Sequence, residues 1–120
     1  KLDIILMPIS ITRFEAEKAL IHINKLGISA GIIHLVNLKP FNLKKDWITA
    51  IKSSRCGVLM TDNDYEDGIL RTIAHKISEK TEKRVHVMGL KNKSAGHTET
   101  KDNLPPNCFE IVKKVKKIIK

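Results

Sequence analysis

The sequence predicts an α/β fold, a three-layer α/β/α sandwich built on a mainly parallel sheet of four strands. Short apolar runs of strand length alternate four times with patterns of helical periodicity. No hairpin turn signal joins two of these runs, so we expect parallel strands joined by right-handed crossovers, with helices on both faces. The 120 residues, 42% hydrophobic and 29% charged, fit one core and a single domain over residues 1–120. Because the first residue is Lys1 and not Met, we expect a fragment of a longer chain.

The first strand and the first helix have recognisable ends. Residues 3–7 form an apolar run closed by Pro8, which is typical of a strand buried on both faces. Thr12, with Glu15 three residues later, predicts a capping box, and Gly27 stands where a left-handed helix end belongs. The apolar stripe of this helix is Ala16, Ala19, Leu20, Ile23 and Leu26.

Two further strand–helix pairs follow the first one along the chain. Residues 30–36 and 56–61 are predicted strands. Pro40 breaks the chain after the first of them, and Asn42 can cap the second helix. Asp64 is the predicted N-cap of the third helix. The apolar stripes are Leu43, Trp47, Ile48 and Ile51 in the second helix and Ile69, Leu70, Ile73, Ala74 and Ile77 in the third.

The last unit contains a short strand and the most basic helix. Residues 85–88 are the fourth predicted strand, and the polar stretch 89–107 is irregular. Asn107 with Glu110 predicts a capping box that opens the last helix. Its inward stripe is Ile111, Val112, Val115, Ile118 and Ile119. Its solvated face carries Lys113, Lys114, Lys116, Lys117 and Lys120.

The composition narrows the classes of partner. A net charge of +9 could attract a polyanion, but the chain has only five aromatic residues and few arginines, which disfavours nucleic acid. No apolar run approaches the roughly 18 residues that cross a bilayer, so no membrane partner is expected. Cys56 and Cys108 belong to no C-x-x-C motif, and we expect both to be small buried residues. The lack of a disulfide framework or a zinc motif favours a cytoplasmic location, where thiols stay reduced.

Motifs for cofactor and metal chemistry are missing from the sequence. Neither the G-x-G-x-x-G fingerprint nor the Walker A loop follows any predicted strand. Counted from Asp62, a calcium loop would need glycine and glutamate where Asp67 and Ile73 stand. A deaminase-like set of His97, Glu99 and Cys108 lacks the second thiol. We therefore expect no metal, cofactor-binding or catalytic residues in this chain.

One crevice remains as a candidate binding site. Open parallel sheets place ligands outside the carboxyl ends of their strands. Hydroxyl, amide, amine and carboxylate groups follow three of the predicted strands and could meet a small anion there. They belong to Ser10, Thr12, Asn37, Lys39, Asp62 and Asp64. Simple helix capping is the favoured interpretation of Thr12 and Asp64.

The order of these segments resembles the C-terminal domain of the transketolase family. Residues 3–6 (DIIL) are similar to that family's D-V-T-I-V strand, and residues 15–20 (EAEKAL) to its E-A-L-K-A-A helix. Residues 34–42 (HLVNLKPFN) are similar to D-L-R-T-L-x-P-L-D, and residues 60–64 (MTDND) to V-V-D-E-D. Within the family the resemblance points to the β chain of thiamine-diphosphate-dependent 2-oxo acid dehydrogenases of the pyruvate dehydrogenase type. Pyruvate-ferredoxin oxidoreductases contain a similar domain.

The resemblance implies a role in assembly. In that family, upstream domains bind thiamine diphosphate with a divalent metal, while the C-terminal domain organises the dimer and packs against them. The resemblance thus implies part of a thiamine-diphosphate-dependent transferase or oxidoreductase, without catalytic residues of its own. The expected partners are the upstream thiamine-binding domains or subunit and a second copy. The alternative is a freestanding α/β module that binds a small anion or polyanion at the carboxyl ends of its strands.

The resemblance also implies a missing strand. The family's sheet has a further, antiparallel strand just before the segment matched by residues 3–7, and it lies beside the strand matched by residues 30–36. This sequence starts too late to contain it. We therefore expect residues 30–36 to form an unpaired edge that promotes association.

Overall fold

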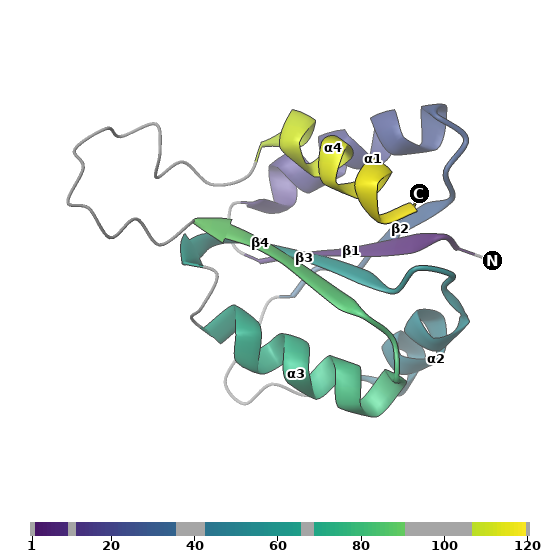
Figure 1. The fold of residues 1–120 in the computed structure, drawn as a ribbon, viewed down its shortest axis with the longest axis vertical. Helices are drawn as coiled ribbons and strands as arrows, with labels where there is room; N and C mark the ends of the chain where they lie inside the picture. The colour runs from purple at the N-terminus through teal and green to yellow at the C-terminus, as the bar shows by residue number, and fades with distance from the viewer. Residues whose placement is uncertain (1, 10–11, 36–42, 66–68, 91–106, 120) are drawn as a thin grey trace.

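The computed structural model describes residues 2–9, 12–35, 43–65, 69–90 and 107–119, with the backbone alone at 62–65, 69–70 and 89–90. The elements are β1 (Ile4–Pro8), α1 (Thr12–Lys25), β2 (Ala30–Ile32), α2 (Lys45–Ser53), β3 (Val58–Tyr65), α3 (Ile69–Thr81), β4 (Val85–Leu90) and α4 (Cys108–Ile119). The strands pair in the order β2-β1-β3-β4, and all pairs are parallel. Figure 1 shows α1 and α4 on one face of the sheet and α2 and α3 on the other. The predicted fold class is confirmed.

The core has two halves, one on each face of the sheet. Successive side chains of β1 alternate between them: Ile4 and Leu6 pack toward α1 and α4, while Ile5 and Met7 pack toward α2 and α3. All four are at most 1% exposed. The sequence expectation of a strand buried on both faces is therefore confirmed, and β1 lies at the centre of the molecule.

Two predicted helix ends are confirmed. Gly27 has φ 87°, which is the left-handed conformation that ends a helix most easily on glycine. At the start of α4 the Asn107 backbone N–H donates to Glu110 Oε1 over 3.1 Å, and the Glu110 backbone N–H donates to Asn107 Oδ1 over 2.9 Å. This reciprocal pair is the capping box that the sequence predicted.

The predicted capping box of Thr12 and Glu15 is wrong. The Glu15 carboxylate instead accepts the backbone N–H of Cys108 over 2.7 Å. The start of α4 packs beside α1, so its free N–H groups lie within reach of the neighbouring helix. Glu15 thus caps a helix that begins more than ninety residues later in the chain.

The predicted N-cap at Asp64 is also wrong. β3 extends through Asp62 and Asp64 to Tyr65, and α3 begins only at Ile69. The neighbouring β4 explains the extension, because Tyr65 still pairs with Leu90 after an irregularity in the ladder. The apolar run alone suggested an earlier end, since it does not show where a partner strand ends.

Smaller differences concern the second unit. β2 covers only residues 30–32 of the predicted 30–36, followed by an isolated bridge between Ile9 and Leu35. Lys44 precedes α2 without a side-chain cap bond, while Asn42 lies outside the described residues. Within the described part of the chain, β2 is a terminal strand of the sheet, as predicted.

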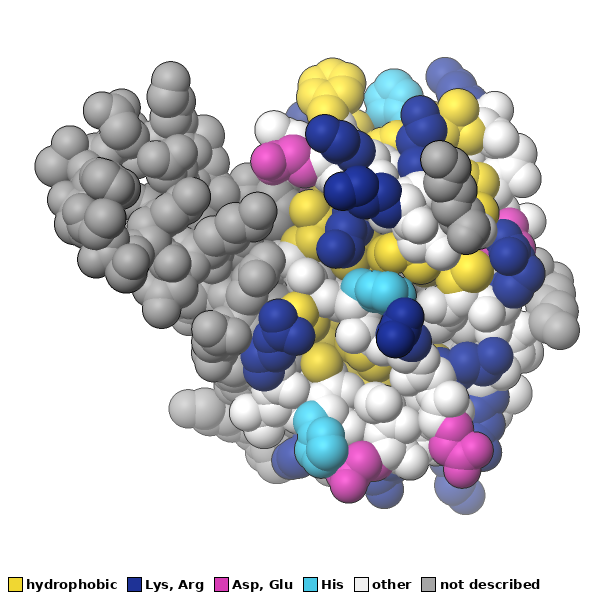
Figure 2. Space-filling model, in the orientation of Figure 1, with side chains coloured by type: hydrophobic (Ala, Val, Ile, Leu, Met, Phe, Trp, Pro, Cys, Tyr) yellow, Lys and Arg dark blue, Asp and Glu magenta, His cyan; other side chains and the backbone are white. Residues whose placement is uncertain are grey.

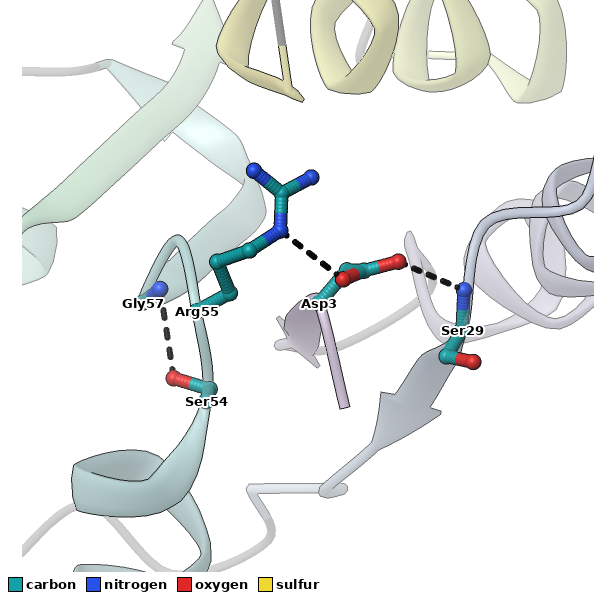
Figure 3. Close-up of polar contacts among 5 residues, drawn as sticks. All are labelled: Asp3, Ser29, Ser54, Arg55 and Gly57. Atoms are coloured by element: carbon teal, nitrogen blue, oxygen red, sulfur yellow. Dashed lines mark hydrogen bonds and ion pairs between the residues drawn. The ribbon is translucent and has the colours of Figure 1, made fainter. Parts of the chain in front are cut away.

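The amino-terminal ends of β1, β2 and β3 are joined by a polar clamp (Figure 3). The Asp3 carboxylate accepts the backbone N–H of Ser29 and the Nε–H of Arg55, each over 3.0 Å. The hydroxyl of Ser54 accepts the Gly57 N–H over 3.2 Å. The Arg55 hydrogen bond and then the Ser29 N–H lower the pKa of Asp3. The clamp thus connects three segments that are distant in sequence.

Candidate functional site

Beside the carboxyl end of β1, the first residue of α1 and the middle of β3 meet at a pair of threonine hydroxyls. The Thr61 hydroxyl donates to Thr12 Oγ1 over 3.1 Å, and Thr12 Oγ1 also accepts the Ile9 N–H over 3.2 Å. The Thr12 proton can reach the carbonyl of Ile9 or that of Thr61. Both threonines are 1% exposed. Thr12 Oγ1 is therefore occupied by the protein itself, and it stabilises the turn after β1.

The other predicted crevice residues are described only in part. Asp62 and Asp64 lie in β3, beyond Thr61 and thus toward the carboxyl end of the sheet. Ser10, Asn37 and Lys39 lie outside the described residues. An anion site formed by the six residues together stays a prediction.

The two cysteines differ from each other. Cys108 is 5% exposed, and burial, followed by the nearby Glu15 carboxylate, raises the pKa of its thiol. A thiol of this kind stays protonated and is a poor nucleophile or ligand. Cys56 is half-buried, so the expectation that both cysteines are buried is wrong for this one.

Metal ligation finds no support in the described segments. No group of three or more His, Cys, Asp or Glu side chains there is arranged to hold an ion. His34 lies two residues beyond β2 and pairs with Glu17 over 3.2 Å. His75 pairs with Glu79 on α3 over 3.4 Å. His97 and Glu99 lie outside the described residues.

A basic cavity at the opposite, amino-terminal end of the sheet was missed by the sequence reasoning. Its lining includes Arg84, the residue before β4, His86 in β4, and Lys114 and Lys117 from α4. One signal could have found it: His86 stands between two apolar strand residues, at a position whose side chain faces α1 and α4. Its cationic neighbours could not be found in this way because they belong to another element.

The fold is shared with two solved structures. A chain described as "Split gene transketolase, inactive beta4 tetramer" superposes with a TM-score of 0.77 at 19% identity, covering 98% of this chain and 38% of that one. A 2-oxoglutarate:ferredoxin oxidoreductase from Magnetococcus marinus gives a TM-score of 0.71 at 16% identity, covering 100% of this chain and 18% of that one. At such identities the likeness establishes a transketolase-like fold.

Comparison of the sequence with known proteins does not assign the chain to a family. Neither a protein-family model nor a curated protein matches the chain. Among the described helices, none has the length and apolar character that a membrane crossing requires. The chain spans well under half the length of both structural neighbours.

Proposed function

We propose that this chain is the C-terminal assembly domain of a thiamine-diphosphate-dependent enzyme of the transketolase or 2-oxo acid dehydrogenase type. The observation that carries the proposal is the fold shared over 98% of the chain with a split-gene transketolase, of which this domain covers 38%. The family-like segments from residue 3 to residue 64 support it independently. The closer likeness to the pyruvate dehydrogenase β chain is part of the proposal.

The surface of the helical layer formed by α1 and α4 supports an assembly role. Phe14 and Ile21, seven residues apart on α1, are 53% and 58% exposed, and Phe109 on α4 is 78% exposed. Large exposed apolar side chains on one layer are typical of a surface that another protein covers. The described polar groups at the carboxyl ends, Thr12 and Thr61, are already bonded to each other. Packing and association are therefore the contributions that this chain is best suited to make.

The split-gene neighbour also supports a role in assembly. That protein is described as an inactive tetramer, which is an assembly without activity. By analogy, we propose that this chain associates with itself and with a thiamine-binding partner, and that the partner supplies the thiamine diphosphate, the divalent metal and the catalytic residues.

The proposal is tested by titration and reconstitution. Calorimetry of the purified chain with thiamine diphosphate and Mg²⁺ should give no heat of binding. The reading frame upstream of Lys1, or an adjacent gene, should encode a thiamine-binding domain of roughly 200 residues. Adding that domain should give a stable complex by sedimentation. Cofactor binding by the chain alone, or a thiamine-binding partner that does not bind it, would contradict the proposal and favour the freestanding anion-binding module.

A further inference from the structure

A cavity lies at the amino-terminal ends of β3 and β4, beneath the C-terminal half of α4. Its volume is about 360 Å³, and it is lined by Cys56, Arg84, His86, Lys114, Lys117 and Ile118. Figure 2 shows this face, where Lys and Arg side chains gather over α4 and the neighbouring part of β4, with a histidine between them. The cavity lies at the end of the sheet opposite the predicted crevice.

The periodicities of two elements bring these side chains together. Along β4, Val85 and Val87 pack toward α2 and α3, so the alternation turns His86 toward α4. On α4, Lys114, Lys117 and Ile118 are spaced by three and four residues and therefore form one stripe. Two lysines on this stripe face the strand position that carries a histidine.

Within the part of the chain that the structure describes, no carboxylate forms an ion pair with the cations of the cavity, Arg84, Lys114 and Lys117. Arg55, in the turn before β3, is by contrast neutralised by Asp3 over 3.0 Å. Cationic groups around one hollow repel each other, and an anion placed between them removes the repulsion. The cavity is therefore electrostatically complementary to an anion.

Burial and the cationic surroundings of the cavity both act on the pKa of His86. Burial lowers its pKa, and the charges of Arg84 and Lys114 lower it further. Lys117 and the Cys56 thiol are the other ionisable groups that line the same cavity. An anion bound there favours the protonated imidazole, so anion binding and protonation of His86 strengthen each other.

We propose that this cavity binds a small molecule through a phosphate group, with Arg84, Lys114 and Lys117 contacting the phosphate oxygens and His86 taking up a proton as the ligand binds. Three fixed cations and one titratable group suit the roughly two negative charges of a phosphate better than the single charge of a carboxylate. The volume lies within the range of about 300–1,000 Å³ that is typical of small-molecule sites. The assembly role does not require such a ligand, so this site is a separate property of the chain.

The experiment is a titration of the purified chain with inorganic pyrophosphate, followed through the NMR signal of the His86 ring. At constant ionic strength, saturating pyrophosphate should raise the pKa of His86 by about one unit. The double variant Lys114→Ala/Lys117→Ala should weaken binding by about tenfold or more. The matched control Lys113→Ala/Lys116→Ala removes the same charge from the same helix, but neither residue lines the cavity. It should change the affinity by no more than about twofold.

A second variant tests the proton linkage. His86→Gln keeps a polar side chain but cannot titrate, so the affinity for pyrophosphate should no longer increase as the pH falls through the His86 pKa. A chloride titration that raises the His86 pKa as much as pyrophosphate does would overturn the proposal, because charge screening would then explain the shift. An equal loss of affinity in the two lysine double variants would also overturn it.

Discussion

The two ends of the sheet are stabilised by different kinds of polar interaction. At the amino-terminal end, Asp3 joins Arg55 and Ser29 through a charged contact whose two side chains are 27% and 53% exposed. At the carboxyl end, Thr12 and Thr61 form a neutral contact that is almost fully buried. Water screens the first contact and competes for its partners, while the second has no access to water. The buried neutral pair should therefore contribute more to stability.

The largest expected effect tests how closely the amino-terminal end is packed. Gly57 has φ 88°, and a Cβ there would lie 2.2 Å from the Arg84 carbonyl oxygen. Gly57→Ala should lower the free energy of unfolding by roughly 2–5 kcal/mol, because backbone strain and steric overlap add. Gly27→Ala is the matched control, with φ 87° but no atom within 4 Å of the added carbon. Urea unfolding should show that the control loses about 1–2 kcal/mol in the free energy of unfolding. Equal losses in the two variants would show that β3 and β4 separate easily at Gly57.

The second effect tests the buried hydroxyl pair. Thr12→Val keeps the shape but leaves the Thr61 hydroxyl without its acceptor, while the Ile9 N–H keeps its bond to the Thr61 carbonyl over 2.8 Å. We expect a loss of about 1–3 kcal/mol in the free energy of unfolding. Thr12→Ser keeps the hydroxyl and removes one methyl group, which should cost about 1 kcal/mol. A serine variant less stable than the valine variant would show that packing, and not hydrogen bonding, dominates at this end.

The third effect concerns the contact between α1 and α4. Glu15→Ala removes the acceptor of the Cys108 N–H and should cost about 1 kcal/mol, as the loss of a helix cap does. The pKa of Glu15 is lowered, first by this hydrogen bond, so its contribution is present above the unfolded pKa and is lost as the pH falls through the folded pKa, below 4.5.

The control for this variant lies on the same helix. Glu17→Ala removes an exposed carboxylate that pairs only with His34 among the described residues, and the change should stay within about 0.5 kcal/mol. Thermal unfolding at neutral and acidic pH measures both variants. If Glu15→Ala keeps the full acid sensitivity of the parent chain, another group is responsible for it.

The smallest effect concerns the exposed clamp. Asp3→Asn keeps an acceptor for the Ser29 N–H but removes the charge that faces Arg55. Because the pKa of Asp3 is lowered, its stabilisation is present above the unfolded pKa and lost on the acidic side of 3.8. The variant should differ little from the parent at neutral pH, and high salt should abolish that difference. A difference that persists in high salt would mean that the clamp is more than a screened surface contact.

The sequence by itself determined the order of the elements, the burial of β1 on both faces, the glycine end at Gly27 and the capping box of Asn107 and Glu110. These features depend on residues close together in the chain, where periodicity and capping preferences act directly. Of the predicted site, the structure places Thr12 at the start of α1 and Asp62 and Asp64 in the second half of β3, and the anion site itself stays a prediction. The sequence did not indicate that the Thr12 hydroxyl is already bonded to Thr61.

Only the tertiary structure decided which distant groups meet. Glu15 caps α4 and not its own helix because the two helices pack side by side, and β3 continues past Asp64 because β4 pairs with it. The cavity around His86 has the same origin, since Arg84 and Lys114, which both line it, are thirty residues apart in the chain. Local pattern determines what each segment becomes, whereas the partners of a polar group depend on the packing of segments that the chain brings together only on folding.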